Sequence, residues 1–228
     1  MKSNKLRFGV AALIVATVAC SLSPSNPTVT PSPAVPTDTA TPAATDTATP
    51  IVTETVTPLP SGAGPCLATT AVGVTTYTRP SLLADVFSTV PLPPDTPITS
   101  RSADGWLGFD PGVAQAANIG VFRLRWLPPD APVTLTGNCA GLPVEPWVPE
   151  PGACYEMVMG PVEVHAAADP ASAVSATLNV GDFAAILGRT ATGWLFVNGD
   201  EANTPGVVGF IPELDMNANG PCDSIPNV

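Results

Sequence analysis

The chain contains one segment twice, and this duplication constrains its fold more than any other feature. Sliding the 228-residue sequence on itself by 88 positions places Cys66 on Cys154 and residues 105–107 (Gly-Trp-Leu) on residues 193–195 (Gly-Trp-Leu). The matches between these points need no gap and include the pairs Val74/Val162, Thr76/Val164, Tyr77/His165, Val86/Val174, Val90/Leu178, Leu92/Val180 and Ile98/Ile186. Farther along, Phe122 falls on Phe210. A repeat of this length indicates one structural unit used twice.

The ends of the two copies follow from the cysteines that bracket them. The closing residues Cys139 and Cys222 differ by 83 positions, so the second copy is five residues shorter near its end. We expect one module at 65–140 and a second at 153–228, joined by a proline-rich linker at 141–152.

Each copy has the pattern of short strands separated by proline and glycine. Residues 72–77 and 161–165 alternate between apolar and polar positions, which is typical of β-strands. The segment 177–187 breaks at Gly-Asp and then becomes apolar, and further strands are expected at 192–197 and 207–214. No helical stripe of useful length occurs. The fold class predicted for each module is therefore all-β, as a small barrel.

The order of short motifs supports a family resemblance. Copy one contains the runs Tyr77-Thr78-Arg79-Pro80-Ser81, Gly105-Trp106-Leu107 and Trp126-Leu127. Copy two contains the runs Val162-Glu163-Val164-His165, Asp169-Pro170, Leu178-Asn179-Val180-Gly181-Asp182, Gly193-Trp194-Leu195-Phe196-Val197 and Val208-Gly209-Phe210-Ile211-Pro212-Glu213-Leu214. This order resembles the bacterial SH3-like (SH3b) domain, although copy one has Pro93-Pro94-Asp95 where the family has a Gly-Asp turn. The resemblance implies two tandem SH3-like β-barrels.

The resemblance also implies where a ligand would bind. SH3-like domains of bacterial envelopes are usually recognition units, and their groove lies among the loop after the first strand, the Gly-Trp strand and the last strand. The ligand-binding candidates are then Tyr77, Arg79, Trp106, Trp126, His165, Trp194 and Phe210. Trp106 and Trp194 are more simply interpreted as cover for the barrel core, whereas Tyr77 and Trp126 are better candidates for partner contact.

The four cysteines of the repeats are expected to form disulfides. Four cysteines allow three pairings. Duplication favours Cys66–Cys139 and Cys154–Cys222, because each module then closes itself, and SH3-type barrels bring their termini close together. There is no Cys-x-x-Cys, and His165 is the single histidine, so neither a metal site nor a cysteine nucleophile is predicted.

The first 19 residues have the composition of a secretory signal peptide. Lys2, Lys5 and Arg7 precede eleven apolar or small residues at 8–18, a stretch too short to cross a bilayer. The run Ala19-Cys20 resembles the cleavage site of bacterial lipoproteins, with Thr17 at a position where an aliphatic residue is usual. That resemblance implies a lipid on Cys20 and attachment to a membrane at the cell surface or in the periplasm.

Residues 20–64 are expected to form a disordered stalk. Residues 21–64 of this stalk include 11 threonines and 9 prolines among 44 residues, and no aromatic residue. Such a composition cannot bury enough apolar surface to offset the entropy of ordering. Proline favours an extended spacer.

Charge narrows the choice of partners. The chain carries −11, and removal of the three basic residues of the leader leaves 5 − 19 = −14. Nucleic acid and other polyanions are therefore unfavourable partners. We predict a non-catalytic surface lipoprotein without cofactors that binds cell-wall peptides or envelope proteins. The alternatives are a scaffold of the envelope and, third, an accessory subunit of a cell-wall hydrolase.

Overall fold

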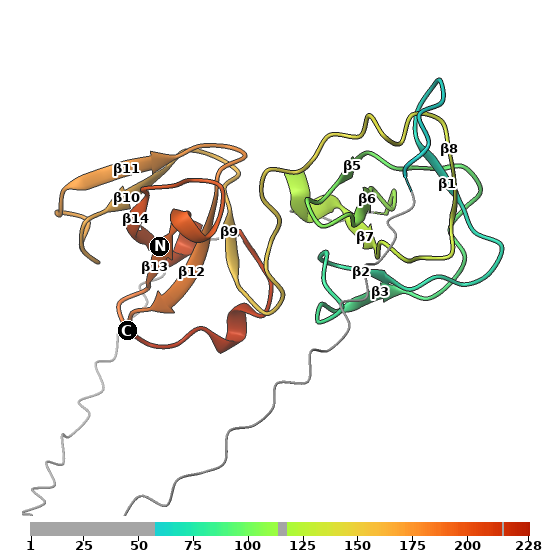
Figure 1. The fold of residues 1–228 in the computed structure, drawn as a ribbon. Helices are drawn as coiled ribbons and strands as arrows, with labels where there is room; N and C mark the ends of the chain where they lie inside the picture. The colour runs from blue at the N-terminus through green and yellow to red at the C-terminus, as the bar shows by residue number, and fades with distance from the viewer. Residues whose placement is uncertain (1–57, 114–117, 216) are drawn as a thin grey trace, which may run out of the picture. The chain divides into compact units, whose positions relative to one another are not determined.

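The computed structural model describes residues 58–113, 118–215 and 217–228 (Figure 1). The predicted signal peptide, Cys20 and most of the stalk lie outside these residues. The described residues form strands and short 3-10 turns without an α-helix, which confirms the all-β prediction. All strand pairs are antiparallel.

Copy one builds two sheets. Its strands are β1 (Leu67–Thr69), β2 (Thr76–Tyr77), β3 (Val86–Ser88), β4 (Thr96–Pro97), β5 (Ser100–Arg101), β6 (Leu107–Phe109), β7 (Arg125–Leu127) and β8 (Thr134–Thr136), with the turn η1 (Gly120–Arg123) before β7. The strand orders are β4-β1-β8 and β3-β2-β7-β6-β5.

Copy two builds one seven-stranded sheet. Its strands are β9 (Tyr155–Met157), β10 (Val162–His165), β11 (Val174–Leu178), β12 (Phe183–Arg189), β13 (Trp194–Asn198), β14 (Val208–Pro212) and β15 (Ala218–Asn219). The short turns are η2 (Gly199–Glu201), η3 (Glu213–Asp215) and η4 (Cys222–Ser224). The strand order is β11-β10-β14-β13-β12-β9-β15, which is the order of copy one with its two sheets joined.

The two copies share register as well as strand order. Ser100 lies opposite Gly108 in copy one, and the residues 88 positions on, Gly188 and Phe196, lie opposite each other in copy two. After each closing cysteine the chain returns to the same place: Val144 bridges Arg101, and Asn227 bridges Arg189, both in parallel. The duplication therefore extends to individual backbone pairs.

One proline accounts for the division of copy one into two sheets. The long strand β12 corresponds to β4 and β5 together, since Ala184 and Arg189 lie 88 positions after Thr96 and Arg101. Pro97 replaces the alanine of copy two, and a proline has no N–H to donate to a neighbouring strand. The strand pairing closes none of the three sheets into a barrel.

The last strands correct one match made from the sequence. Tyr77 lies opposite Trp126, and His165 lies opposite Phe210, so the counterpart of Phe210 is Trp126 and not Phe122. The sequence offset changes from 88 to 84 because four extra residues of copy one lie in the connection between β6 and β7. Loops accept such insertions more readily than strands. Phe122 lies instead in the turn η1, where it is buried.

Both predicted disulfides are present. Cys66 is bonded to Cys139 and Cys154 to Cys222. Residues just before Cys66 also pair with the end of copy one: Ser61 bridges Asn138, and the Gly62 N–H donates to Gly137 O at 2.9 Å. The segment 61–64, expected to be part of the stalk, is thus attached to the first module.

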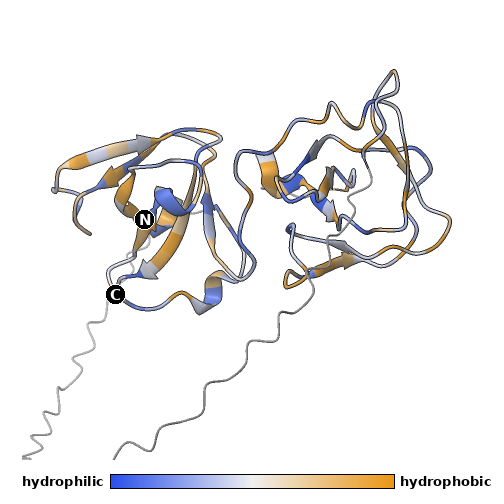
Figure 2. Ribbon diagram, viewed as in Figure 1, coloured by the Kyte–Doolittle hydropathy of each residue, from blue (hydrophilic) through white to orange (hydrophobic). Residues whose placement is uncertain are grey.

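Apolar residues gather in three clusters, and the strands carry most of them (Figure 2). One cluster belongs to each copy and contains its disulfide. The third cluster, here called the shared cluster, takes residues from both copies: Trp106, Val121, Phe122, Trp126, Tyr155, Met157, Phe183 and Ala185. Burial of this much aromatic surface is a strong reason for the two copies to pack together.

Candidate functional site

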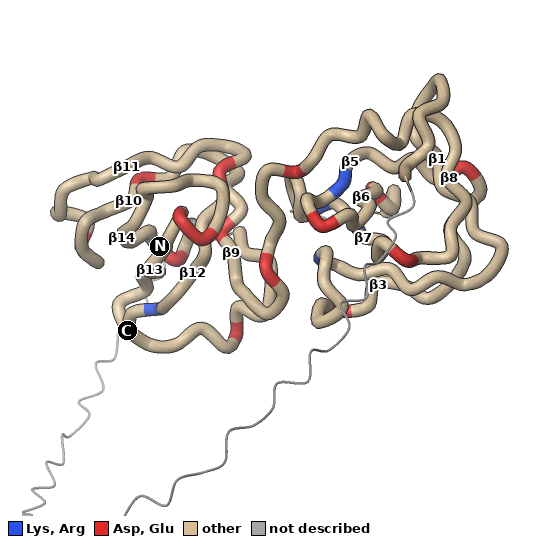
Figure 3. The backbone as a smooth tube through the Cα atoms, in the orientation of Figure 1, with Lys and Arg blue, Asp and Glu red and all other residues tan. Residues whose placement is uncertain are grey.

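A cavity of about 670 Å³ is lined by copy one, the linker and copy two. Five carboxylates border it: Asp104, Glu145, Glu150, Asp200 and Glu201. Much of the remaining wall consists of prolines of the linker and of the loop after β2, together with Trp147 and Tyr155. We call it the acidic cavity. Acidic residues on the segment between β8 and β9 are visible in Figure 3, among few basic ones.

Local hydrogen bonds hold three of the five carboxylates in place. Asp104 accepts from the hydroxyl of Ser102 in the turn before β6. In η2, Asp200 accepts from the N–H of Gly206 at 2.6 Å and Glu201 accepts from the Asn198 amide at 3.2 Å. Local turns therefore fix the direction of these three carboxylates, and none of these neutral donors cancels their negative charge.

Two aromatic rings form the inner wall of the acidic cavity. Trp147 of the linker and Tyr155 of β9 meet edge to face, with ring centroids 5.2 Å apart. The N–H of Glu150 donates to the Tyr155 hydroxyl at 3.0 Å. Burial raises the pKa of Tyr155, although this hydrogen bond and Arg79 oppose the rise. Carboxylates beside the half-buried ring of Trp147 suit a ligand with a positive charge.

Arg79 lies behind this wall and joins the two copies. Its Nη1 donates to Glu150 O and, at 2.9 Å, to Ala153 O, and its Nη2 donates to Asn219 O and Oδ1 at 3.4 and 3.2 Å. The guanidinium carbon lies 5.3 Å from the centroid of the Tyr155 ring. Desolvation by burial lowers the pKa of Arg79, and nearby Tyr155, Asp85 and Glu150 partly offset this effect.

The other predicted ligand residues of copy one pack together. Tyr77 contacts Trp106 edge to face at 5.5 Å and lies opposite Trp126 across β2 and β7. Trp106 is 5% exposed and Trp126 is 0% exposed. Trp126 was expected to face a partner, but it is buried in the shared cluster.

Copy two repeats this arrangement. His165 contacts Trp194 edge to face at 5.3 Å and lies opposite Phe210 across β10 and β14. His165 and Trp194 are buried, and Phe210 is half-buried against Phe196 at 5.2 Å. The structure thus brings together the aromatic candidates of each copy, yet none of the six lines the acidic cavity.

Sequence reasoning missed most of the charged and aromatic residues that line the cavity. Glu145, Trp147 and Glu150 fall in the segment interpreted as a plain linker, and Asp200 and Glu201 follow a strand without belonging to any motif. One signal was present: a tryptophan between two glutamates is unusual in a solvated linker.

Within 58–113, 118–215 and 217–228, no three or more histidine, cysteine or acidic residues are grouped as a metal site. The same residues include no helix that could span a bilayer. No model of a known protein family and no curated protein matches the chain. The inference about function therefore depends on the cavity.

Proposed function

We propose that the chain is an exported, lipid-anchored and non-catalytic envelope protein whose acidic cavity binds the amine of a cell-wall peptide. In this proposal the two copies are SH3-like modules, raised from the membrane by the stalk. The two disulfides support a location outside the reducing cytosol.

The five carboxylates that line one cavity, together with Trp147, carry the proposal. A primary ammonium group donates three hydrogen bonds and gains from the Coulomb field of several carboxylates at once. Trp147, which is half-buried, adds a surface on which an aliphatic amine stem can pack. Peptidoglycan stem peptides offer such an amine on a short chain.

The test is a calorimetric titration with soluble stem peptides whose side-chain amine is either free or acetylated. The free amine is expected to bind, and acetylation to weaken binding by about tenfold, because it removes the charge and two of the donors. The double variant Glu145→Gln/Glu150→Gln keeps shape and removes two charges from the cavity. It should weaken binding of the free amine and leave the acetylated peptide unchanged.

The matched control is Asp130→Asn/Glu163→Gln, which removes two exposed charges outside the cavity. This variant should bind as the wild type does. Equal affinity for both peptides, or no binding of either, would exclude the proposed function.

An envelope scaffold is the second candidate, favoured by a separate observation. Strand β3 is at the edge of its sheet, and apolar side chains on and around it are exposed: Leu82 70%, Leu83 88%, Val86 54% and Val90 63%. An apolar edge strand is suited to pairing with another chain. Crosslinking on intact cells with a photoreactive residue at position 86 should then capture one protein partner, and no crosslinked species would argue against a scaffold.

A further inference from the structure

A second cavity, of about 500 Å³, lies beside the acidic cavity and has the opposite charge character. Arg79 and Arg125 line it, and Asp85 is its one acidic residue. We call it the arginine cavity. The two cavities have Pro151 in common, and the stacked Arg79 and Tyr155 stand between them.

Arg79 and Arg125 are the most buried of the arginines in the part of the chain that the structure describes. Arg79 is 5% exposed and Arg125 is 8% exposed, whereas Arg101, Arg123 and Arg189 are not buried. A buried guanidinium is costly unless hydrogen bonds and a counter-charge compensate it. Both of these buried guanidinium groups line one cavity, although the net charge of the chain is −11.

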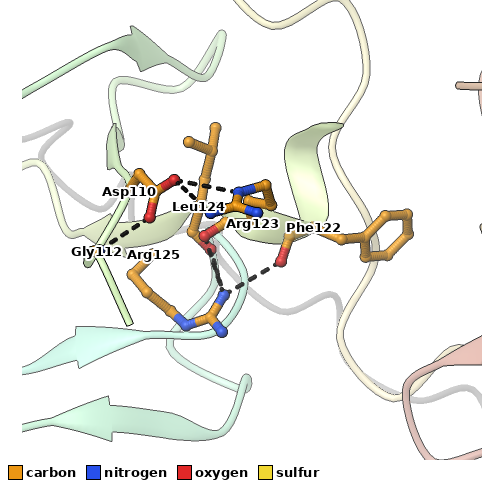
Figure 4. Close-up of polar contacts among 6 residues, drawn as sticks. All are labelled: Asp110, Gly112, Phe122, Arg123, Leu124 and Arg125. Carbon is orange, nitrogen blue, oxygen red and sulfur yellow. Dashed lines mark hydrogen bonds and ion pairs between the residues drawn. The ribbon is translucent and has the colours of Figure 1, made fainter. Parts of the chain in front are cut away.

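Neutral oxygens satisfy much of the hydrogen bonding of these arginines. Nη1 of Arg125 donates to Leu124 O at 2.7 Å and to Phe122 O at 3.2 Å (Figure 4). The guanidinium of Arg125 lies over the Phe87 ring. The four acceptors of Arg79 are carbonyl or amide oxygens, and Arg79 makes no ion pair with a described residue. Neutral acceptors orient a guanidinium but leave its net charge in place.

Burial also affects the ionisation of these two arginines, because it disfavours the charged form. Burial lowers the pKa of both Arg79 and Arg125. Both nonetheless remain charged at neutral pH, since arginine is not deprotonated in proteins. A negatively charged group entering the cavity would therefore meet a preformed positive field.

We propose that the arginine cavity is a subsite for a carboxylate, and that it acts together with the acidic cavity on one dipolar peptide. This inference depends on the proposed function, because it assigns the second charged end of the same ligand. Arginine suits a carboxylate, and Asn118 and Asn219, joined by an amide hydrogen bond of 3.0 Å, line the cavity beside it. A polyanion would be repelled by the whole chain, whereas a peptide with one amine and one carboxylate would not.

Asp85 makes the subsite testable without disturbing the packed core. It is exposed and lines the arginine cavity, so its charge should oppose a carboxylate there. Asp85→Asn is expected to raise affinity for a stem peptide with free amine and free carboxylate by about two- to fivefold. The same substitution should not change affinity for the peptide amidated at its carboxylate. Amidation itself should weaken binding to the wild type by about tenfold or more.

Asp130→Asn is the matched control, since it removes one exposed charge from a residue that lines neither cavity. Arg125→Gln should weaken binding of the free carboxylate, but this residue is buried, so the gain in Asp85→Asn is the deciding result. If acetylation of the amine weakens binding and amidation does not, the carboxylate subsite is wrong and the proposed function stands. If no peptide binds, both are wrong.

Discussion

Arg79 was expected to meet a ligand from the loop after the first strand of copy one. It extends instead toward the second copy, where its guanidinium lies over Tyr155 and donates to oxygens of Glu150, Ala153 and Asn219. The surface that the Arg79 side chain contacts is determined by residues 70 or more positions away in the sequence.

Ionisation of Tyr155 can be used to test its contact with Arg79. Its pKa is raised by burial above the ordinary value of about 10. A raised folded-state pKa stabilises the fold in full below the unfolded value, and this stabilisation is lost as pH rises through the folded value. Stability should therefore fall as pH rises above about 10, and this part of the decline should be absent in Tyr155→Phe.

The chain has two tyrosines, so Tyr77→Phe isolates Tyr155 for spectrophotometric titration. We expect its absorbance near the phenolate band to rise with a midpoint above pH 10. A midpoint at or below the ordinary value would contradict the buried position given to Tyr155.

At the scale of elements, the positions of strands in copy two follow the sequence closely. The break predicted at Gly181-Asp182 separates β11 from β12, and the Gly-Trp run opens β13. Copy one departs more, since only Thr76 and Tyr77 of the strand expected at 72–77 are paired as β2. Short-range alternation detects strands that have partners along most of their length, and β2 pairs with β7 at one residue pair.

The turn after β8 tests the attachment of residues 61–64 to copy one. Gly137 has a φ of +83°, and a Cβ placed on it would lie 1.9 Å from Pro65 O. Gly64 has a similar φ of +85° but nothing within 4 Å of such a Cβ. Gly64→Ala should cost about 1 to 2 kcal/mol from backbone strain alone. Gly137→Ala should cost about 2 kcal/mol more, because the backbone must shift.

Denaturant unfolding of both variants measures the difference. Equal losses of free energy of unfolding would mean that the close approach of Gly137 to residue 65 does not occur in solution.

For the whole molecule, the shared cluster makes the two copies one folding unit. Phe122 is 3% exposed and contacts Tyr155 at 5.6 Å and Phe183 at 5.0 Å, both in copy two. Phe122→Ala should lower the free energy of unfolding by about 3 to 5 kcal/mol, since it removes a buried aromatic ring. It should also divide one calorimetric transition into two, because it removes a ring through which the two copies contact each other.

Phe196→Ala is the control for this experiment. Phe196 is half-buried and packs on Phe210 inside copy two. Its removal should lower stability while the single transition remains. A wild-type protein with two separate transitions would contradict the coupling.

The sequence by itself determined the duplication, the all-β class and the pairing of the four cysteines. These features depend on local alternation and on an 88-residue offset, both of which are visible along one chain. Tertiary structure alone decided that Trp126 is covered, that Arg79 joins the copies, and that the linker carboxylates meet Asp104, Asp200 and Glu201 around one cavity. The physical reason is that alternation shows which side of a strand is buried but not what buries it. Between two copies of one module, that covering surface is set by contacts at long range in the sequence.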